Sequence, residues 1–155
     1  MAAAHNLVYC SQSDNCLWVA RLQLLPLLVH RLFDSSAAIV AEAASAIANL
    51  CVADDVRVAT VRNQALQACV MLLDHGDEAV CCSSCGIIMN VSSNPECAVH
   101  LMQAGAHYKL VEVAVAHGDS TICGNSGTSS TACRALANVR DSLSCALSLS
   151  FLGRY

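Results

Sequence analysis

The chain has 155 residues, of which 55% are hydrophobic and 13% are charged, and its formal net charge is −4. This length suits one domain with a sizeable core. The negative balance and a single lysine, Lys109, argue against nucleic acid as a partner, because its binding requires clustered cations. The low charge also predicts that partners cover much of the surface.

The most apolar stretch, residues 17–33, does not qualify as a membrane span. Arg21, Pro26 and His30 interrupt it, and it is shorter than the ~20 apolar residues that a crossing needs. The N-terminus lacks the basic and apolar regions of a secretory signal. We therefore expect a cytoplasmic protein without membrane contact, in which the 11 cysteines are reduced and mostly buried.

Four asparagines, Asn6, Asn49, Asn90 and Asn138, recur at separations of 43, 41 and 48 residues. Each follows a stretch of small residues and precedes an aliphatic residue. Residues 27–50 also align with residues 68–91 without a gap. A period near 40 is the signature of stacked helical repeats, and it predicts an all-α solenoid.

Helical periodicity assigns each predicted third helix a core face. With the asparagine at 0° and about 100° per residue, a small and aliphatic face lies about 150° away, and the asparagines then face the inner wall of the solenoid. The predicted core positions are Ala43, Ala44, Ile47 and Leu50, then Ser84, Cys85, Ile88 and Val91, then Ala132, Cys133, Leu136 and Val139.

The other predicted elements follow in chain order. Trp18 is assigned to a first helix, and a second helix is expected to bury Leu25, Leu28, Val29 and Leu32, which recur at helical spacing. Asn94 and Pro95 predict a capped helix start, and Gly105 predicts its end after Gln103. Gly76 and Gly118 are expected to end second helices, and residues 120–130 to form an inserted loop.

These features resemble armadillo-repeat proteins, whose third helix ends in Asn-Leu and in which a glycine, here Gly105, precedes the second helix. The resemblance extends from Asn6 to about Val139. It implies a right-handed α-solenoid of about three stacked three-helix repeats. We expect one array over residues 1–155, with a partial unit at 1–22 and units near 23–64, 65–106 and 107–155. The ends of the chain lack polar terminal repeats, which predicts a longer array or ends that other proteins bury.

Armadillo arrays are binding surfaces, so the resemblance implies a non-catalytic scaffold for protein–protein interaction. The sequence contains no Gly-x-Ser-x-Gly, His-Glu-x-x-His or phosphate-binding Gly-Lys-Ser/Thr motif, and we expect no enzymatic activity, cofactor or small-molecule substrate. The predicted partner-binding groove comprises Glu42, Ser45, Asn49, Ser83, Gly86, Asn90, Thr131, Arg134 and Asn138.

Two interpretations of the asparagines remain open. Their amides could hold the backbone of an extended peptide, as in armadillo families, or they could fasten neighbouring helices and loops. Nuclear-import adaptors of this family carry tryptophan four residues before the asparagine. Here Ser45, Gly86 and Arg134 stand at those positions, so recognition of basic nuclear signals is not expected.

Residues 85–113 more narrowly resemble ciliary armadillo proteins associated with axonemal radial spokes. This implies a cytoskeletal location and a permanent place, with several protein partners, in a large assembly such as the axoneme. Two alternatives stay open. One is a soluble transient adaptor that binds an extended peptide in its concave groove. The other is a metal- or redox-responsive module that uses Cys81, Cys82, Cys85 and Cys97.

Two further patterns have competing interpretations. Cys82 and Cys85, followed by Cys97 and His100, have the pair spacing of zinc ligands, but Cys85 falls on a predicted core face, so buried thiols are favoured. His75 and His117 recur in equivalent turns. Histidines that bond free carbonyls at helix C-termini are favoured there over a pH-sensitive or metal-binding row.

Overall fold

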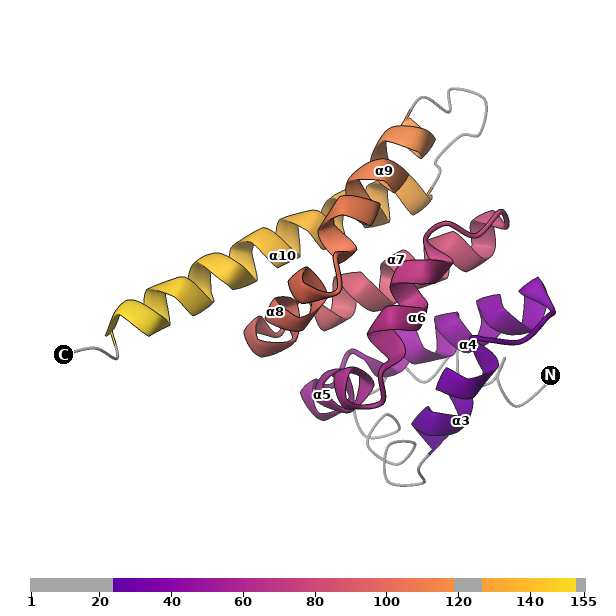
Figure 1. Ribbon diagram of the computed structural model, residues 1–155, viewed down its shortest axis with the longest axis horizontal. Helices are drawn as coiled ribbons and strands as arrows, with labels where there is room; N and C mark the ends of the chain where they lie inside the picture. The colour runs from indigo at the N-terminus through magenta and orange to yellow at the C-terminus, as the bar shows by residue number, and fades with distance from the viewer. Residues whose placement is uncertain (1–23, 119–126, 153–155) are drawn as a thin grey trace.

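The computed structural model describes residues 24–118 and 127–152, and every regular element in these ranges is an α-helix. The prediction of an all-α chain is therefore confirmed. The helices, labelled in Figure 1, are α3 (Leu24–Arg31), α4 (Ala37–Leu50), α5 (Asp54–Arg62), α6 (Ala65–Leu72), α7 (Glu78–Val91), α8 (Pro95–Gln103), α9 (Ala106–Gly118) and α10 (Gly127–Leu152).

Third helices stack on third helices, and first helices on first helices. The long third helices α4, α7 and α10 lie side by side, and α10 continues beyond α7 and α8 (Figure 1). The first helices α5 and α8 also contact each other. This is an α-solenoid, with complete triplets α5–α6–α7 and α8–α9–α10. The predicted unit boundaries follow the same period, but each predicted unit begins at a second helix instead of a first helix. The division into units 23–64, 65–106 and 107–155 remains a prediction.

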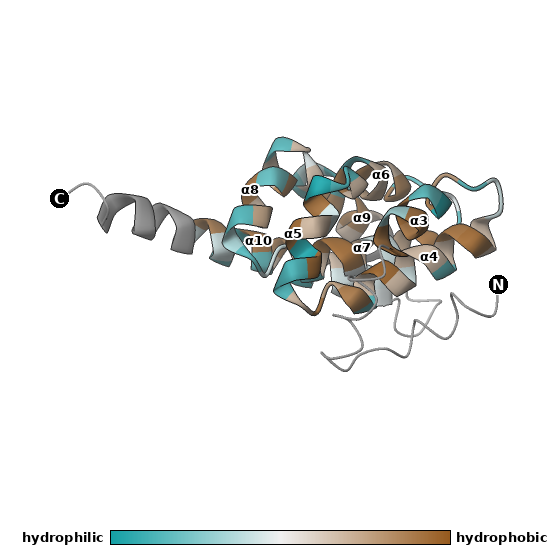
Figure 2. Cartoon of the chain, turned by 90° about the horizontal axis from the view of Figure 1, so that it is seen from below, coloured by the Kyte–Doolittle hydropathy of each residue, from teal (hydrophilic) through white to brown (hydrophobic). Residues whose placement is uncertain are grey.

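The predicted core faces of the first two layers are buried. Leu25, Leu28, Val29 and Leu32 are 2–8% exposed, and all eight predicted core residues of α4 and α7 are buried. In Figure 2 the third helices α4 and α7 are mostly brown or pale, whereas hydrophilic residues gather on α5, α8 and the turns.

One core assignment in α10 is wrong. Cys133 is exposed, although Ala132 and Val139 are buried and Leu136 is half-buried. The equivalent residue Cys85 lies on α7, which packs between α4 and α10. In the described part of the chain α10 has only one third-helix neighbour, α7, so the position of Cys133 is left uncovered.

Several predicted helix ends are confirmed. The Asn94 side chain accepts hydrogen bonds from the backbone amides of Glu96 and Cys97, and Pro95 begins α8. Gly105 follows the end of α8 with a φ of 76°. At the equivalent junction between α5 and α6, Gln64 takes a φ of 58° without being glycine. This left-handed position was not predicted.

The predicted role of His75 is wrong. Its Nδ1 accepts a hydrogen bond from the Asp77 backbone amide at 3.0 Å, so this nitrogen does not donate to a helix carbonyl. Gly76 lies in the same turn, after α6 has ended at Leu72, and Asp77 caps α7 through Ala79 and Val80. The side chain of His117 lies outside the described residues.

The predicted loop at 120–130 is too long at its C-terminal end, because residues 127–130 already belong to α10. Residues 119–126, Asn6, Trp18 and the partial unit 1–22 lie outside the described ranges. Among the described helices, none combines the length and the hydropathy needed to cross a membrane.

Candidate functional site

The nine predicted groove residues lie on the three adjacent helices α4, α7 and α10. Eight of them are half-buried, and Arg134 is exposed. Such side chains are packed on one side and reachable on the other, which suits the wall of a binding surface. That they contact a partner remains a prediction.

Two asparagines on these helices, Asn90 and Asn138, make the same cross-layer contact. We call them, together with Asn49 at the equivalent position of α4, the amide ladder. Asn90 Nδ2 donates to the carbonyl oxygen of Ala48 at 2.7 Å, and Asn138 Nδ2 donates to that of Met89 at 3.0 Å. In each case the acceptor directly precedes the asparagine of the neighbouring helix. The same bond is therefore made in the same register at both interfaces.

The acceptors explain why an amide is needed there. The last carbonyls of a helix have no partner within the helix, because the residue four positions later lies beyond its end. For Ala48 that residue is Val52, and α4 ends at Leu50. A carbonyl oxygen can bond only to a donor, so the amide nitrogen of Asn90 must point toward it. The ladder thus caps the C-terminus of one helix with a side chain from the next.

This geometry supports the interpretation that the asparagines fasten neighbouring helices. Asn49 also has an interaction partner. The same geometry is compatible with a second role for the amides, as contacts of a partner. Within the described residues the side-chain oxygens of Asn90 and Asn138 accept no hydrogen bond, while both residues remain half-buried.

Gly86 lies where α7 faces α4. A Cβ atom at this position would lie 3.5 Å from the Cβ of Ala48, which is ordinary van der Waals contact, so there is room for a methyl group here. Asn90 lies one turn after Gly86 and reaches the Ala48 carbonyl from there.

Another hydrogen bond between layers, made by Ser142, was not predicted. Ser142 Oγ donates to the carbonyl of Ser92 at 2.6 Å, and both residues are buried. Ser142 lies one turn after Asn138 on α10. This spacing was the available sequence signal, but a serine at such a position is also typical of a solvent-exposed residue.

The candidate zinc ligands are not brought together. Among the described residues, no group of three or more His, Cys, Asp or Glu side chains is placed to hold a metal ion. The hydrogen bond between Cys81 and Cys85, together with burial, raises the pKa of the Cys85 thiol. Burial is also the main cause that raises the pKa of Cys97. Cys82 is half-buried and His100 is exposed.

The family model described as armadillo/beta-catenin-like repeat matches residues 12–52, a segment that contains α3 and α4 and ends just after Asn49 and Leu50. A comparison with curated proteins finds no match.

The chain is similar to several designed or engineered solved structures. One engineered protein has a TM-score of 0.81 at 23% identity, over 90% of this chain and 56% of that one. A designed armadillo repeat protein has a TM-score of 0.79 at 26% identity, over 88% and 56%. Another, solved in complex with the peptide (KR)4, has a TM-score of 0.78 at 24% identity, over 92% and 60%.

The stacked helices form an α-solenoid. One segment of it matches the armadillo repeat, and its fold is similar to that of designed armadillo repeat proteins. The chain spans somewhat more than half the length of the three structures described.

Proposed function

We propose that this chain is a non-catalytic protein-interaction scaffold that binds an extended segment of a partner along the wall formed by α4, α7 and α10. The supporting observation is the amide ladder, in which the side-chain oxygens of Asn90 and Asn138 accept no hydrogen bond from the described residues. Packed helices are 8–10 Å apart, which corresponds to between two and three residues of an extended chain. A bound backbone could therefore donate one N–H group to each layer.

The positions one turn before the asparagines determine the side chains that fit. Armadillo-type grooves that hold lysine or arginine stems need an aromatic shelf, and Ser45, Gly86 and Arg134 provide none. Glu42 is the one acidic residue of the proposed groove, and Arg134 is exposed. We therefore propose a segment with small and neutral side chains, in contrast to the basic peptide bound by the designed protein.

The experiment is a selection of peptides from a random displayed library against the folded chain, followed by affinity measurements on two variants. Ser45→Arg combined with Ser83→Arg places two bulky cations on the wall without removing an amide. Ser35→Arg, on the exposed turn before α4, is the matched control. We expect the first variant to bind the selected peptide with at least tenfold lower affinity and the control to bind it with unchanged affinity. An unchanged affinity in the wall variant would discard the groove.

We further propose that the scaffold belongs to a large cytoskeletal assembly such as the ciliary axoneme. The support is the resemblance of residues 85–113 and the low fraction of charged residues, 13%. Affinity purification of the tagged chain from its own cells would recover microtubule components if this is correct. Purification as a stable monomer with transient partners would instead favour the soluble adaptor.

A further inference from the structure

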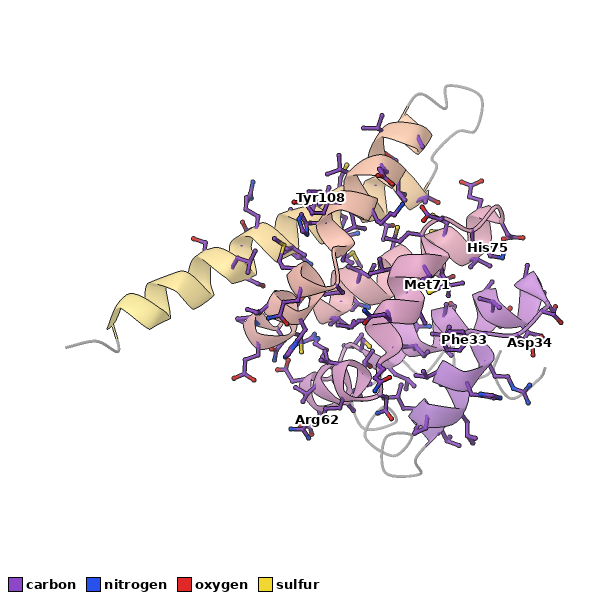
Figure 3. All side chains as sticks on the ribbon, in the orientation of Figure 1. Phe33, Asp34, Arg62, Met71, His75 and Tyr108 are labelled. Atoms are coloured by element: carbon purple, nitrogen blue, oxygen red, sulfur yellow. The ribbon has the colours of Figure 1, made fainter. Side chains whose placement is uncertain are left out.

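Three large apolar side chains are exposed on the second-helix side of the solenoid. Phe33, Met71 and Tyr108 are 66%, 68% and 70% exposed, and we call them the outer ridge. They come from the turn after α3, from α6 and from α9, so each successive layer contributes one. Figure 3 shows them following one another across the three layers.

An ion pair links the parts of the chain that carry neighbouring members of the ridge. Lys109 Nζ lies 3.0 Å from Asp74 Oδ2, between α9 and the turn after α6. Tyr108 directly precedes Lys109, and Met71 lies one turn before Asp74. The start of α9 therefore lies beside the end of α6, with both apolar side chains exposed.

The apolar residues on the outer face of α9 indicate that a partner covers this face. Leu110 and Val113 are buried against the core, yet Val111 and Val115 are 51% and 72% exposed. With Tyr108, these two valines occupy positions i, i+3 and i+7, which form a second apolar stripe on the same helix. A helix that is apolar on both faces is normally buried on both.

The charges along this edge specify the kind of partner. Two cations are present, Arg31 and Lys109, and both are already paired: Arg31 with Asp34, and Lys109 with Asp74 and Glu112. The carboxylates of the edge are more numerous, and they are Asp34, Asp74, Asp77, Glu78 and Glu112. Five carboxylates against two cations leave a negative edge. Because the whole chain carries −4, a second copy would be repelled.

We propose that the outer ridge binds an amphipathic helix of another protein, with apolar residues on one face and lysine or arginine along its flank. Packed helices lie about 8–10 Å apart, and a helix rises about 1.5 Å per residue, so anchors about seven residues apart, which return to the same face of a helix, would meet successive layers. The apolar anchors of such a helix would give affinity, and its cations would set its orientation on the ridge. It uses neither the amide ladder nor the wall.

The test uses a fluorescent 18-residue amphipathic helix with leucine on one face and lysine on the flanks, followed by fluorescence anisotropy at low salt. We expect saturable binding that Phe33→Ser, Met71→Ser and Tyr108→Ser together weaken at least tenfold. Val52→Ser, which removes a side chain that is 49% exposed between α4 and α5, is the matched control and should change nothing. A peptide with glutamate in place of lysine should bind at least tenfold more weakly.

Each other outcome would overturn the proposal. These outcomes are no saturable binding, equal binding of the glutamate peptide, an unchanged affinity of the triple variant, or a loss caused by Ser45→Arg with Ser83→Arg instead. Far-UV circular dichroism checks that the variants are folded. If sedimentation shows a dimer that the triple variant dissociates, the occupant is a second copy and the proposed partner is wrong.

Discussion

The amide ladder predicts a ranked series of stabilities that starts from Asn90→Ala. Removing this side chain leaves the Ala48 carbonyl, at the buried end of α4, without the donor of its 2.7 Å hydrogen bond. An unsatisfied buried acceptor costs about 1–3 kcal/mol. We therefore expect the free energy of unfolding of Asn90→Ala to fall by about 2 kcal/mol.

The effect of Asn138→Ala should be smaller, although its hydrogen bond is similar. The acceptor of Asn138, the Met89 carbonyl, also accepts the hydroxyl of Ser92 at 2.8 Å. That carbonyl remains paired after the substitution, so the loss should be about 1 kcal/mol or less. The same reasoning covers Asn63→Ala, because the Ala59 carbonyl, which accepts the Asn63 side chain at 2.7 Å, also accepts the Asn63 backbone amide at 2.9 Å.

Asn90→Asp separates hydrogen bonding from side-chain volume. At neutral pH its carboxylate has no donor to offer and faces a carbonyl oxygen, so it should be less stable than Asn90→Ala. Protonation restores a donor, so this difference should shrink as pH falls through the carboxyl range near about 4.

The measurement is urea denaturation followed by circular dichroism at 222 nm for the wild type and the four variants. Equal midpoints for Asn90→Ala and Asn138→Ala would refute the argument from the second donor at Met89. A variant Asn90→Asp that is as stable as Asn90→Ala at neutral pH would show that the nitrogen donor is not what stabilises the layer.

Three other predictions follow from the described side chains. Gly105→Ala should lower stability by about 1 kcal/mol because of its positive φ, whereas Gln64→Gly should raise it by a few tenths, both measured by thermal melting. In the native chain, iodoacetamide should modify the exposed Cys133 well before the buried Cys85, because a hydrogen bond with Cys81 and burial raise the pKa of Cys85. Peptide mass spectrometry distinguishes the two modified sites. Hydrogen bonding from Arg57 lowers the pKa of Asp54, so Asp54→Asn should cost under about 0.5 kcal/mol at neutral pH, and its urea midpoint should approach the wild type's as pH falls through that lowered pKa.

The sequence predicted what depends on local pattern. The 41-residue offset between Asn49 and Asn90 and the faces of α4 and α7 required only helical periodicity. The start of α8 at Pro95 and its end before Gly105 required only cap chemistry. Each of these features is determined by residues within a few turns of one another, so side-chain identity was enough.

The features that were missed depend on main-chain groups or on neighbouring layers. The acceptors of the ladder, at Ala48 and Met89, are carbonyls, which every residue carries, so no side-chain pattern could identify them. Cys133 has the sequence environment of Cys85 but lacks a covering helix in the described part of the chain. His75 accepts a bond in its own turn because Asp77, two residues later, supplies an amide there.

The ladder also restricts how the proposed groove can recognise a partner. The Asn90 amide nitrogen donates to a helix carbonyl, and that of Asn138 donates to a helix carbonyl and to Ser93 Oγ at 3.4 Å, so the side-chain oxygens are the atoms that a partner can reach. An oxygen acceptor selects N–H donors, which every extended backbone presents except at proline. The ladder can therefore hold a segment without reading its sequence. Selectivity must then come from the positions one turn earlier, Ser45, Gly86 and Arg134, and substitutions there should change which peptide binds while the ladder keeps the layers together.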